Sequence, residues 1–324
     1  MNRLRVASNW GNVTVVIDTL AFRVRCDDAF ALPTGRVMSI TPGGEVEWQT
    51  MKFLSLRGSH ESTVAIRPTL NRDHEPTLYI SGSPAKWLQG HNIFGTDNLP
   101  GLVTSLWESL VPVLRKHGVT VSDLEIDAVR SGLVELLRVD INYSFSTGSR
   151  ANAIAWISAA VGQAHMQHRG RGILQGDTGY WGLKSRYSVL KAYCKGQEIQ
   201  AKGHQLPLDL RGIGLEQWAD DKLRLEVTLL ARELRRESLS NVANWTPDTP
   251  RVIFMHHLER LHISGEVSMN EEDLQGLPGG ARTAYLAWKS GQDLKVILPR
   301  PTFYRHRKAI MEQHADGFVC LAGG

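Results

Sequence analysis

The sequence predicts an α+β protein in which a largely antiparallel, curved sheet is flanked by helices and followed by a small all-helical domain. Short β-rich runs separated by turn residues fill the chain from Val13 to Ser81, and later strand-like runs alternate with segments of helical periodicity. The segment Trp245–Pro250 then breaks the pattern with two prolines, and the chain beyond it has the residue pattern of helices. We therefore predict one domain over residues 1–244 and a helical C-terminal domain over residues 245–324.

Composition places the chain among ordinary globular proteins. It has 324 residues, 42% of them hydrophobic and 22% charged, and a net charge of +4 that permits nucleic-acid binding without requiring it. Cys26, Cys194 and Cys320 are far apart, so we expect a reduced, cytoplasmic protein without a disulfide scaffold. The basic start lacks an apolar core, and the most apolar helical run, Ala151–Gly162, is too short to span a membrane. We expect no signal peptide and no membrane partner.

The N-terminal strands are predicted to form an antiparallel meander. They span Val13–Val24, Glu45–Arg57, Ser62–Pro68 and Pro76–Ser81. Asp18 in the first strand is either a strand-edge carboxylate or a site residue. The run from Ser81 to Gly95 is predicted to be a loop with a short helical piece, in which His91 is a structural hydrogen-bonding residue.

Three segments have helical periodicity. In Leu99–His117, leucine and valine recur at spacings of three and four, with Asn98 as an N-cap and Gly118 as the terminating residue. Thr147–Gln163 and Leu229–Val242 are the other two predicted helices. The basic, glycine-containing segment between His165 and Gly172 is predicted to be a flexible loop.

Two predicted strands each carry an arginine and an acid two residues apart. In Leu136–Ser144, Arg138 and Asp140 share one face, and in Leu223–Leu229, Arg224 and Glu226 do the same. If the strands are neighbours, the two carboxylates converge, and they repel each other unless a cation lies between them. A hard divalent ion such as Mg²⁺ or Mn²⁺ suits oxygen ligands of this kind. The sequence therefore makes Asp140 and Glu226 candidate metal ligands and Arg138 and Arg224 candidate DNA contacts.

The stretch from Thr178 to Glu198 is predicted to be two strands joined by a short basic turn. Tyr180 and Gly182 share a face of the first strand, and Lys191, Tyr193 and Lys195 share a face of the second. Lysines supply charge and a phenol supplies chemistry, so this surface suits a phosphodiester. Lys184 and Arg186 in the turn are predicted DNA contacts, because the region from Arg169 to Lys202 is strongly basic.

This stretch resembles the active-site segment of the filamentous phage gene II/gene X replication proteins, and more loosely the rolling-circle initiators of staphylococcal-type plasmids. The shared pattern is Tyr180-x-Gly182-x-Lys184-Ser185, then Lys191-x-Tyr193-x-Lys195, then Glu198. The run Ser81-Gly-Ser-Pro-Ala-Lys-Trp-Leu-Gln-Gly-His-Asn-Ile-Phe-Gly95 is also very similar to the phage family. The resemblance implies that Tyr180 is the nucleophile, that Asp140 and Glu226 bind the metal, and that Glu198 is a further ligand.

The resemblance also implies a reaction and a setting. Tyr180 would nick one strand of origin DNA, with Lys191 or Lys195 and the metal lowering the proton affinity of the phenol. The product would be a 5′-phosphotyrosyl link and a 3′-OH primer, and the reverse reaction would rejoin the strand. The implied partners are origin DNA, a host helicase and a DNA polymerase, a homodimer is allowed, and the implied location is the host bacterial cytoplasm.

The C-terminal segment has the outline of a helix-turn-helix module. Helices are predicted over Ala281–Lys289, Gln292–Leu298 and Thr302–Gln313, with Arg305, Arg307 and Lys308 exposed on the third as DNA contacts. The alternative is a small bundle that caps the first domain. The phage family also ends with a Trp-x-x-Gly pattern and a Thr-Phe-Tyr-Arg-x-Arg pattern. This segment keeps them at Trp288–Gly291 and Thr302–Arg307.

Other interpretations stay open at this point. Tyr193 or Tyr187 is an alternative nucleophile. The amino-acid sequence is also compatible with two tyrosines that act one after the other. A non-catalytic DNA-binding regulator and a metal-dependent hydrolytic nuclease are the competing functions. The regulator predicts that replacing Asp140 and Glu226 leaves function intact, and the hydrolase predicts cleavage without covalent attachment.

Overall fold

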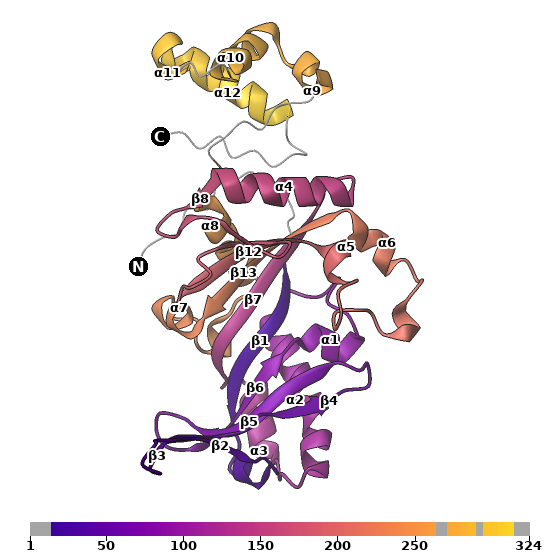
Figure 1. The fold of residues 1–324 in the computed structure, drawn as a ribbon, viewed down its shortest axis with the longest axis vertical. Helices are drawn as coiled ribbons and strands as arrows, with labels where there is room; N and C mark the ends of the chain where they lie inside the picture. The colour runs from indigo at the N-terminus through magenta and orange to yellow at the C-terminus, as the bar shows by residue number, and fades with distance from the viewer. Residues whose placement is uncertain (1–13, 264–270, 290–293, 314–324) are drawn as a thin grey trace.

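A computed structural model describes residues 14–263, 271–289 and 294–313 (Figure 1). The predicted α+β class is confirmed: a large open antiparallel sheet is flanked by helices, and a helical region follows it. The nine strands of the sheet run in the order β10-β11-β12-β13-β7-β1-β6-β5-β4, and every neighbouring pair is antiparallel.

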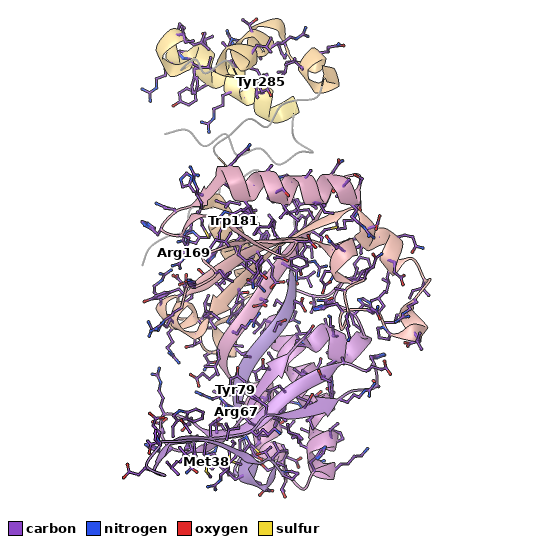
Figure 2. All side chains as sticks on the ribbon, viewed as in Figure 1. Met38, Arg67, Tyr79, Arg169, Trp181 and Tyr285 are labelled. Atoms are coloured by element: carbon purple, nitrogen blue, oxygen red, sulfur yellow. The ribbon has the colours of Figure 1, made fainter. Side chains whose placement is uncertain are left out.

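The N-terminal half of the sheet contains β1 (Val16–Arg25), β4 (Leu54–Arg57), β5 (Thr63–Leu70) and β6 (Pro76–Gly82). The strands are antiparallel as predicted, but only β4, β5 and β6 form a meander, because β1 pairs with β6 and not with β4. The single strand predicted over Glu45–Arg57 is two strands, because β3 (Val46–Met51) leaves the sheet to pair with β2 (Arg36–Ile40) in a separate hairpin. Figure 2 shows Met38 on this hairpin, near Arg67 and Tyr79 of the sheet.

The second half of the sheet positions the candidate site. It contains β7 (Glu135–Ser146), β13 (Lys222–Leu230), β12 (Ser188–Cys194), β11 (Thr178–Trp181) and β10 (Ile173–Gln175). The apolar side chains of these strands form a core with helices α4 (Arg150–Gln163) and α8 (Thr249–Glu259). Trp181 is fully buried beneath α4, as Figure 2 shows. The opposite face of β7, β12 and β13 carries the predicted arginines, lysine and acids.

Local signals in the sequence set most helix ends. Helix α2 (Leu99–Lys116) begins after Asn98, whose side chain accepts a hydrogen bond from the Gly101 amide, and Gly118 follows its end with φ +85°. Helices α1 (Pro84–Gln89), α3 (Asp123–Arg130), α5 (Lys195–Glu198) and α6 (Leu215–Asp220) complete this part of the chain. Within the described ranges, none of the helices is long and apolar enough to cross a membrane.

Two further predictions of local structure were wrong. The helix predicted over Leu229–Val242 is only the short α7 (Ala231–Arg236), because Leu229 and Leu230 belong to β13 and Ser238 takes a left-handed conformation. The loop predicted between His165 and Gly172 is a small hairpin of β8 (Ala164–Met166) and β9 (Gly170–Arg171), to which β14 (Leu261–Ile263) adds a third strand.

The predicted boundary at Trp245 falls inside a packed unit. Trp245, Phe254 and Leu258 belong to the large core, and β14 pairs with β8. The helical region beyond residue 270 consists of α9 (Glu271–Gly276), α10 (Gly279–Lys289), α11 (Leu294–Ile297) and α12 (Arg300–Gln313). Leu277, Ala281, Tyr285 and Ile310 form its own small core. The first unit therefore extends beyond residue 244, and the division into two domains stays a prediction.

The packing of α8 predicts how stability depends on pH. His257 is buried, one of its ring nitrogens lies 3.8 Å from the Glu233 carboxylate, and burial lowers its pKa to about 4. A histidine whose pKa is depressed in the folded state stabilises the fold above its unfolded pKa of roughly 6.5, and this stability is lost as the pH falls toward 4. At about 1.4 kcal/mol per pKa unit, the loss amounts to about 3 kcal/mol.

We expect the His257→Gln variant to unfold at a lower denaturant concentration than wild type near pH 7. We also expect its free energy of unfolding to fall less on acidification. Arg169, Arg236 and Arg260 also influence this pair, and burial raises the pKa of Glu233, whose protonation opposes the histidine effect. The comparison is therefore between the pH slopes of wild type and variant in chemical denaturation. His256→Gln, one position away and more exposed, is the control. Equal slopes for wild type and His257→Gln would contradict the prediction.

Candidate active site

A β-bulge in β1 aims Asp18 into the site. Ile17 pairs with Ile141 and Leu20 pairs with Val139, so Asp18 and Thr19 together face the single residue Asp140 of β7. A bulge of this kind adds one residue to a strand and redirects its side chains. Asp18 is 5% exposed, and its two carboxylate oxygens accept hydrogen bonds from Ser83 Oγ (2.7 Å) and Asn92 Nδ2 (2.6 Å).

A row of polar residues crosses four neighbouring strands on the same face. Tyr180 of β11 pairs with Lys191 of β12, Lys191 pairs with Glu226 of β13, and Glu226 pairs with Asn142 of β7. Side chains directly opposite each other on adjacent strands lie on one face of the sheet and contact each other. The register therefore brings the tyrosine, the lysine and one carboxylate together, and Asp140 joins them from two positions along β7.

Asp140 and Glu226 converge as the sequence predicted. Lys191 Nζ lies 2.6 Å from Glu226 Oε1 and 3.9 Å from Asp140 Oδ2, so its ammonium bridges the two acids. Arg138 donates two hydrogen bonds to Asp140, from Nε at 2.8 Å and from Nη2 at 2.5 Å. Both carboxylates are almost fully buried.

The electrostatics of this pair follow from burial and mutual repulsion. Burial and the Glu226 charge raise the pKa of Asp140 to about 7. Burial acts in the same direction on Glu226, but the Lys191 ammonium and hydrogen bonds from Lys191, Asp140 and Tyr193 outweigh it, and the pKa of Glu226 is lowered. Burial acts to lower the pKa of Lys191, but the two carboxylates raise it, so the lysine is a cation. Two like charges held this close favour a cation between them.

The surroundings of Tyr193 suit nucleophilic attack on a phosphate less well than those of Tyr180. Its hydroxyl donates a hydrogen bond to Glu226 Oε2 at 3.1 Å, and burial together with the Glu226 charge raises its pKa well above the ordinary value. Tyr180 also lines the cavity, and no side chain in the described ranges hydrogen-bonds to its hydroxyl. A phenol of raised pKa is a poor nucleophile. The geometry favours Tyr180 between these two candidates.

Lys195 is the first residue of α5, because β12 ends at Cys194, one residue earlier than the predicted strand. It is not among the residues that line the cavity with Lys191 and Tyr193. Its side chain is fully buried behind the site and donates to Asn92 Oδ1 (2.8 Å) and Glu198 Oε2 (2.6 Å). Burial lowers the pKa of Lys195 to about 8. Lys195 supports the wall of the site rather than lining it.

Glu198 belongs to this second group and not to the Asp140–Glu226 pair. One of its oxygens is bonded to Lys195, and the other lies 2.7 Å from His204 Nδ1. Burial acts to raise its pKa, but Lys195 outweighs burial and lowers it. The partners of Glu198 are thus Lys195 and His204, whereas Asp140 and Glu226 share Lys191.

Arg224 was wrongly predicted as a DNA contact. It is 1% exposed, and its guanidinium donates to Ser144 Oγ (2.9 Å) and to the backbone oxygens of Asn92 (2.7 Å) and Ile93 (2.9 Å). All of these partners are inside the protein. Arg224 fixes the loop that carries Asn92 to Asp18, and so it shapes the site without touching DNA.

We expect Arg224→Met to lower the free energy of unfolding by about 2–6 kcal/mol, because two buried carbonyls lose their donors at about 1–3 kcal/mol each. Arg232→Met, on the exposed side of α7, is the matched control and should change stability little. Chemical denaturation of the three proteins measures the difference. Wild-type stability in Arg224→Met would show that the loop does not depend on this guanidinium.

The turn after Tyr180 needs its glycines. Gly182 has φ +77°, and a Cβ there would lie 3.0 Å from Arg169 Cδ and 3.2 Å from the Ser188 carbonyl oxygen. A Cβ on Gly179 would lie 2.8 Å from Val161 Cγ2 of α4. The glycines on both sides of Tyr180 therefore let β11 pack under α4 and turn back into β12. Lys184 and Arg186 are exposed in that turn, where DNA contact stays a prediction.

A cavity of about 450 Å³ joins these groups. Its wall includes Asp18, Arg138, Asp140, Tyr180, Lys191, Tyr193, Glu198 and Glu226, which the sequence had singled out. Sequence reasoning gave no role to Ser83, Lys86, Asn92 and His204, which also line it. Ser83, Lys86 and Asn92 lie in the Ser81–Gly95 run, whose similarity to the phage family was the available signal. The position of His204 in the cavity could not have been predicted, because no motif near it in the sequence indicates a functional site.

The C-terminal candidates lie apart from these elements in the sequence. Arg305, Arg307 and Lys308 are on α12, and Arg305 and Lys308 are exposed. Their contact with DNA stays a prediction, as does the choice between a DNA-binding module and a capping bundle.

Asp140 and Glu226 are the carboxylates of the cavity that could hold a divalent cation. Asp140 and Glu226 offer hard carboxylate oxygens, and the Lys191 ammonium occupies the position between them that a cation would take. No three His, Cys, Asp or Glu side chains of the described residues form a cluster that could hold a metal ion. Mg²⁺ does not need such a cage, because it is commonly held by one or two carboxylates together with waters and substrate phosphates.

Comparisons with known proteins identify one family. Residues 16–248 match the family model that describes the N-terminal region of a phage replication-associated protein. The replication-associated protein of Enterobacteria phage I2-2 is 36% identical over 287 residues, which cover 87% of this chain and 82% of that protein. Among solved structures, a rolling-circle replication initiator protein from Geobacillus stearothermophilus is similar at 10% identity and a TM-score of 0.34, covering 80% of this chain and 90% of that one.

Proposed function

The chain belongs to this family of phage replication-associated proteins, and we propose that it is a rolling-circle replication initiator that nicks one strand of origin DNA with Tyr180. The observation that carries the proposal is the register of the sheet. It places Tyr180 directly opposite Lys191, beside the buried Asp140–Glu226 pair, in one cavity. A nucleophile, a fixed cation and a pair of acids are the groups that phosphoryl transfer to a side chain requires.

The proposed reaction is a transesterification. The Tyr180 hydroxyl oxygen forms a bond to phosphorus, and the bond from phosphorus to the 3′ oxygen of the preceding nucleotide breaks. The phenol proton passes to a carboxylate or water of the cavity, and the leaving oxygen takes up a proton to become the 3′-OH primer. The strand keeps its 5′ phosphate on Tyr180, and the reverse reaction rejoins the ends. Lys191 contributes a fixed positive charge opposite the phenol, which favours its ionised form.

We further propose that Asp140 and Glu226 hold a Mg²⁺ or Mn²⁺ ion, with Lys191 moving aside or sharing the site. A bound divalent ion would polarise the scissile phosphate and stabilise the charge that develops on it. Glu198 is left out of the proposed ligand pair because its partners are Lys195 and His204, and it does not share Lys191 with Asp140 and Glu226. Arg138 is proposed to contact a phosphate, which is supported by its position in the cavity wall and its 37% exposed side chain.

The remaining parts of the proposal are the partners and the location. Lys184 and Arg186, and the C-terminal Arg305, Arg307 and Lys308, are proposed to contact origin DNA. A DNA polymerase would extend the 3′-OH while a host helicase separates the strands, and the reaction would take place in the host bacterial cytoplasm. A homodimer on the origin is compatible with this role.

Covalent capture tests the function. Internally ³²P-labelled supercoiled DNA carrying the phage origin is incubated with the protein and Mg²⁺ or Mn²⁺, and the protein is then denatured. Nicked DNA with label retained on the protein is the expected result. Nicking without retained label would favour the metal-dependent hydrolase, and origin binding without nicking would favour the non-catalytic regulator.

A further inference from the structure

The loop that follows Asn92, a residue of the cavity wall, carries an exposed aromatic ring. Phe94 is 44% exposed, although it lies between two other rings. Trp218 of α6 contacts it edge-to-face with ring centroids 4.6 Å apart, and the His91 ring lies edge-on at 6.2 Å. Burial, together with Lys195 and His60, lowers the pKa of His91, so all three rings are uncharged near pH 7. An exposed ring held by its neighbours is a ready stacking surface.

The backbone around Phe94 is fixed to the site on both sides. Before it, Asn92 is bonded to Asp18, to Lys195 and, through its carbonyl, to Arg224. After it, the Thr96 carbonyl accepts a hydrogen bond from the Ile17 amide at 3.0 Å, one residue from Asp18. Asn92 and Asp18 both line the cavity. Phe94 is therefore two residues from Asn92 in the cavity wall, on a segment that hydrogen bonds hold on both sides of it.

The second ring is tied to the cavity from the other side. Trp218 packs against a small core made of Ile93, Ile199, Leu206, Leu215 and Ala219. Helix α5, which supplies Glu198 to the cavity, packs directly against α6. The Lys222 ammonium lies 5.0 Å from the Trp218 ring centroid, so that ring already has a cation partner. Phe94 is the more exposed ring of the pair, because Trp218 is half-buried.

From this arrangement we infer that Phe94, supported by Trp218 and His91, is a stacking platform for an unpaired base of the DNA strand that enters the cavity. The inference rests on the proposed function only in taking the ligand of the cavity to be DNA. Every base has a π face, so such a platform holds single-stranded DNA with little dependence on sequence. Lys86 in the cavity wall supplies a positive charge for the adjoining backbone. A base held in this way would be one close to the scissile phosphate.

Binding to single-stranded DNA tests the inference separately from chemistry. The protein is full-length Tyr180→Phe, in which nicking is blocked, and the probe is a fluorescein-labelled thymidine oligonucleotide of about 16 nucleotides, the upper end of site sizes for such surfaces. Stacking of one base is worth about 1–3 kcal/mol, so Phe94→Leu is expected to raise the Kd by about 5- to 150-fold. Phe94→Trp should keep the affinity, and binding to a duplex of equal length should not change.

Two controls separate a lost platform from a damaged fold. Leucine at position 94 keeps an apolar side chain against Trp218, and Phe30→Leu changes an equally exposed phenylalanine (48%) on a different element. Single-strand affinity equal to that of Phe30→Leu would overturn the inference, as would equal losses on single strand and duplex. If wild type fails to nick but binds single strands through Phe94, the inference stands and the proposed function fails. If wild type nicks and Phe94→Leu binds normally, only the inference fails.

Discussion

Tyr180→Phe is expected to abolish both nicking of origin DNA and covalent attachment to it. The variant keeps the ring and removes only the oxygen that would bond to phosphorus, so folding should be preserved. Loss of a catalytic nucleophile costs about 10⁶-fold in well-studied cases, so residual nicking should be at or below the detection limit. The measurement is the nicking rate and the label retained on denatured protein, with wild type run in parallel.

Tyr193→Phe is the matched control. Its ring also lines the cavity, but its hydroxyl is bonded to Glu226 and its pKa is raised. We expect nicking to fall by no more than about tenfold, which corresponds to one hydrogen bond of about 1.4 kcal/mol or less. If label survives in Tyr180→Phe and disappears in Tyr193→Phe, the nucleophile is Tyr193. Label that survives in both single variants would point to Tyr187 or to two tyrosines that substitute for each other.

The second large effect is expected at the carboxylate pair. Asp140→Asn and Glu226→Gln should each slow nicking by about 10³-fold, because a bound metal contributes several kcal/mol of charge stabilisation and about 1.4 kcal/mol is a factor of ten. Each variant also removes a partner of Lys191, so its effect should be read together with the divalent-ion dependence. The nicking rate of wild type should rise and saturate with Mn²⁺, whereas that of the variants should respond weakly.

The Glu198→Gln variant tests whether the proposed metal ion has two or three carboxylate ligands. Because Glu198 contacts Lys195 and His204 and does not share Lys191 with the Asp140–Glu226 pair, we expect its replacement to leave the Mn²⁺ concentration for half-maximal nicking nearly unchanged. A large increase in that concentration would make Glu198 the third ligand. Origin binding, measured by fluorescence anisotropy, should persist in all three acid variants, since removing negative charge does not weaken attraction to phosphates. Full replication activity in Asp140→Asn and Glu226→Gln would instead support the non-catalytic regulator.

Much of the fold could be predicted because it depends on local periodicity. Alternation in Leu136–Ser144 and Leu223–Leu229 identified β7 and β13, since successive side chains of a strand point to opposite faces. Asn98 and Gly118 marked the ends of α2 for equally local reasons. The helix predicted after β13 was too long because residue preferences do not show where a strand ends and a helix begins.

The sequence by itself determined which reactive and charged side chains this protein has. They are a tyrosine near a glycine, lysines on one face of a strand, and two strands that each carry an arginine and an acid. The tertiary structure decided what each member does. Arg138 and Arg224 occupy equivalent positions in the same pattern, yet Arg138 binds Asp140 at the cavity while Arg224 is buried against the loop at Asn92 and Ile93. The bulge that turns Asp18 inward and the early end of β12 that buries Lys195 were likewise set by pairing with distant strands and by the loops that cover them. Strand register and burial depend on contacts between residues far apart in the chain, and no local pattern contains them.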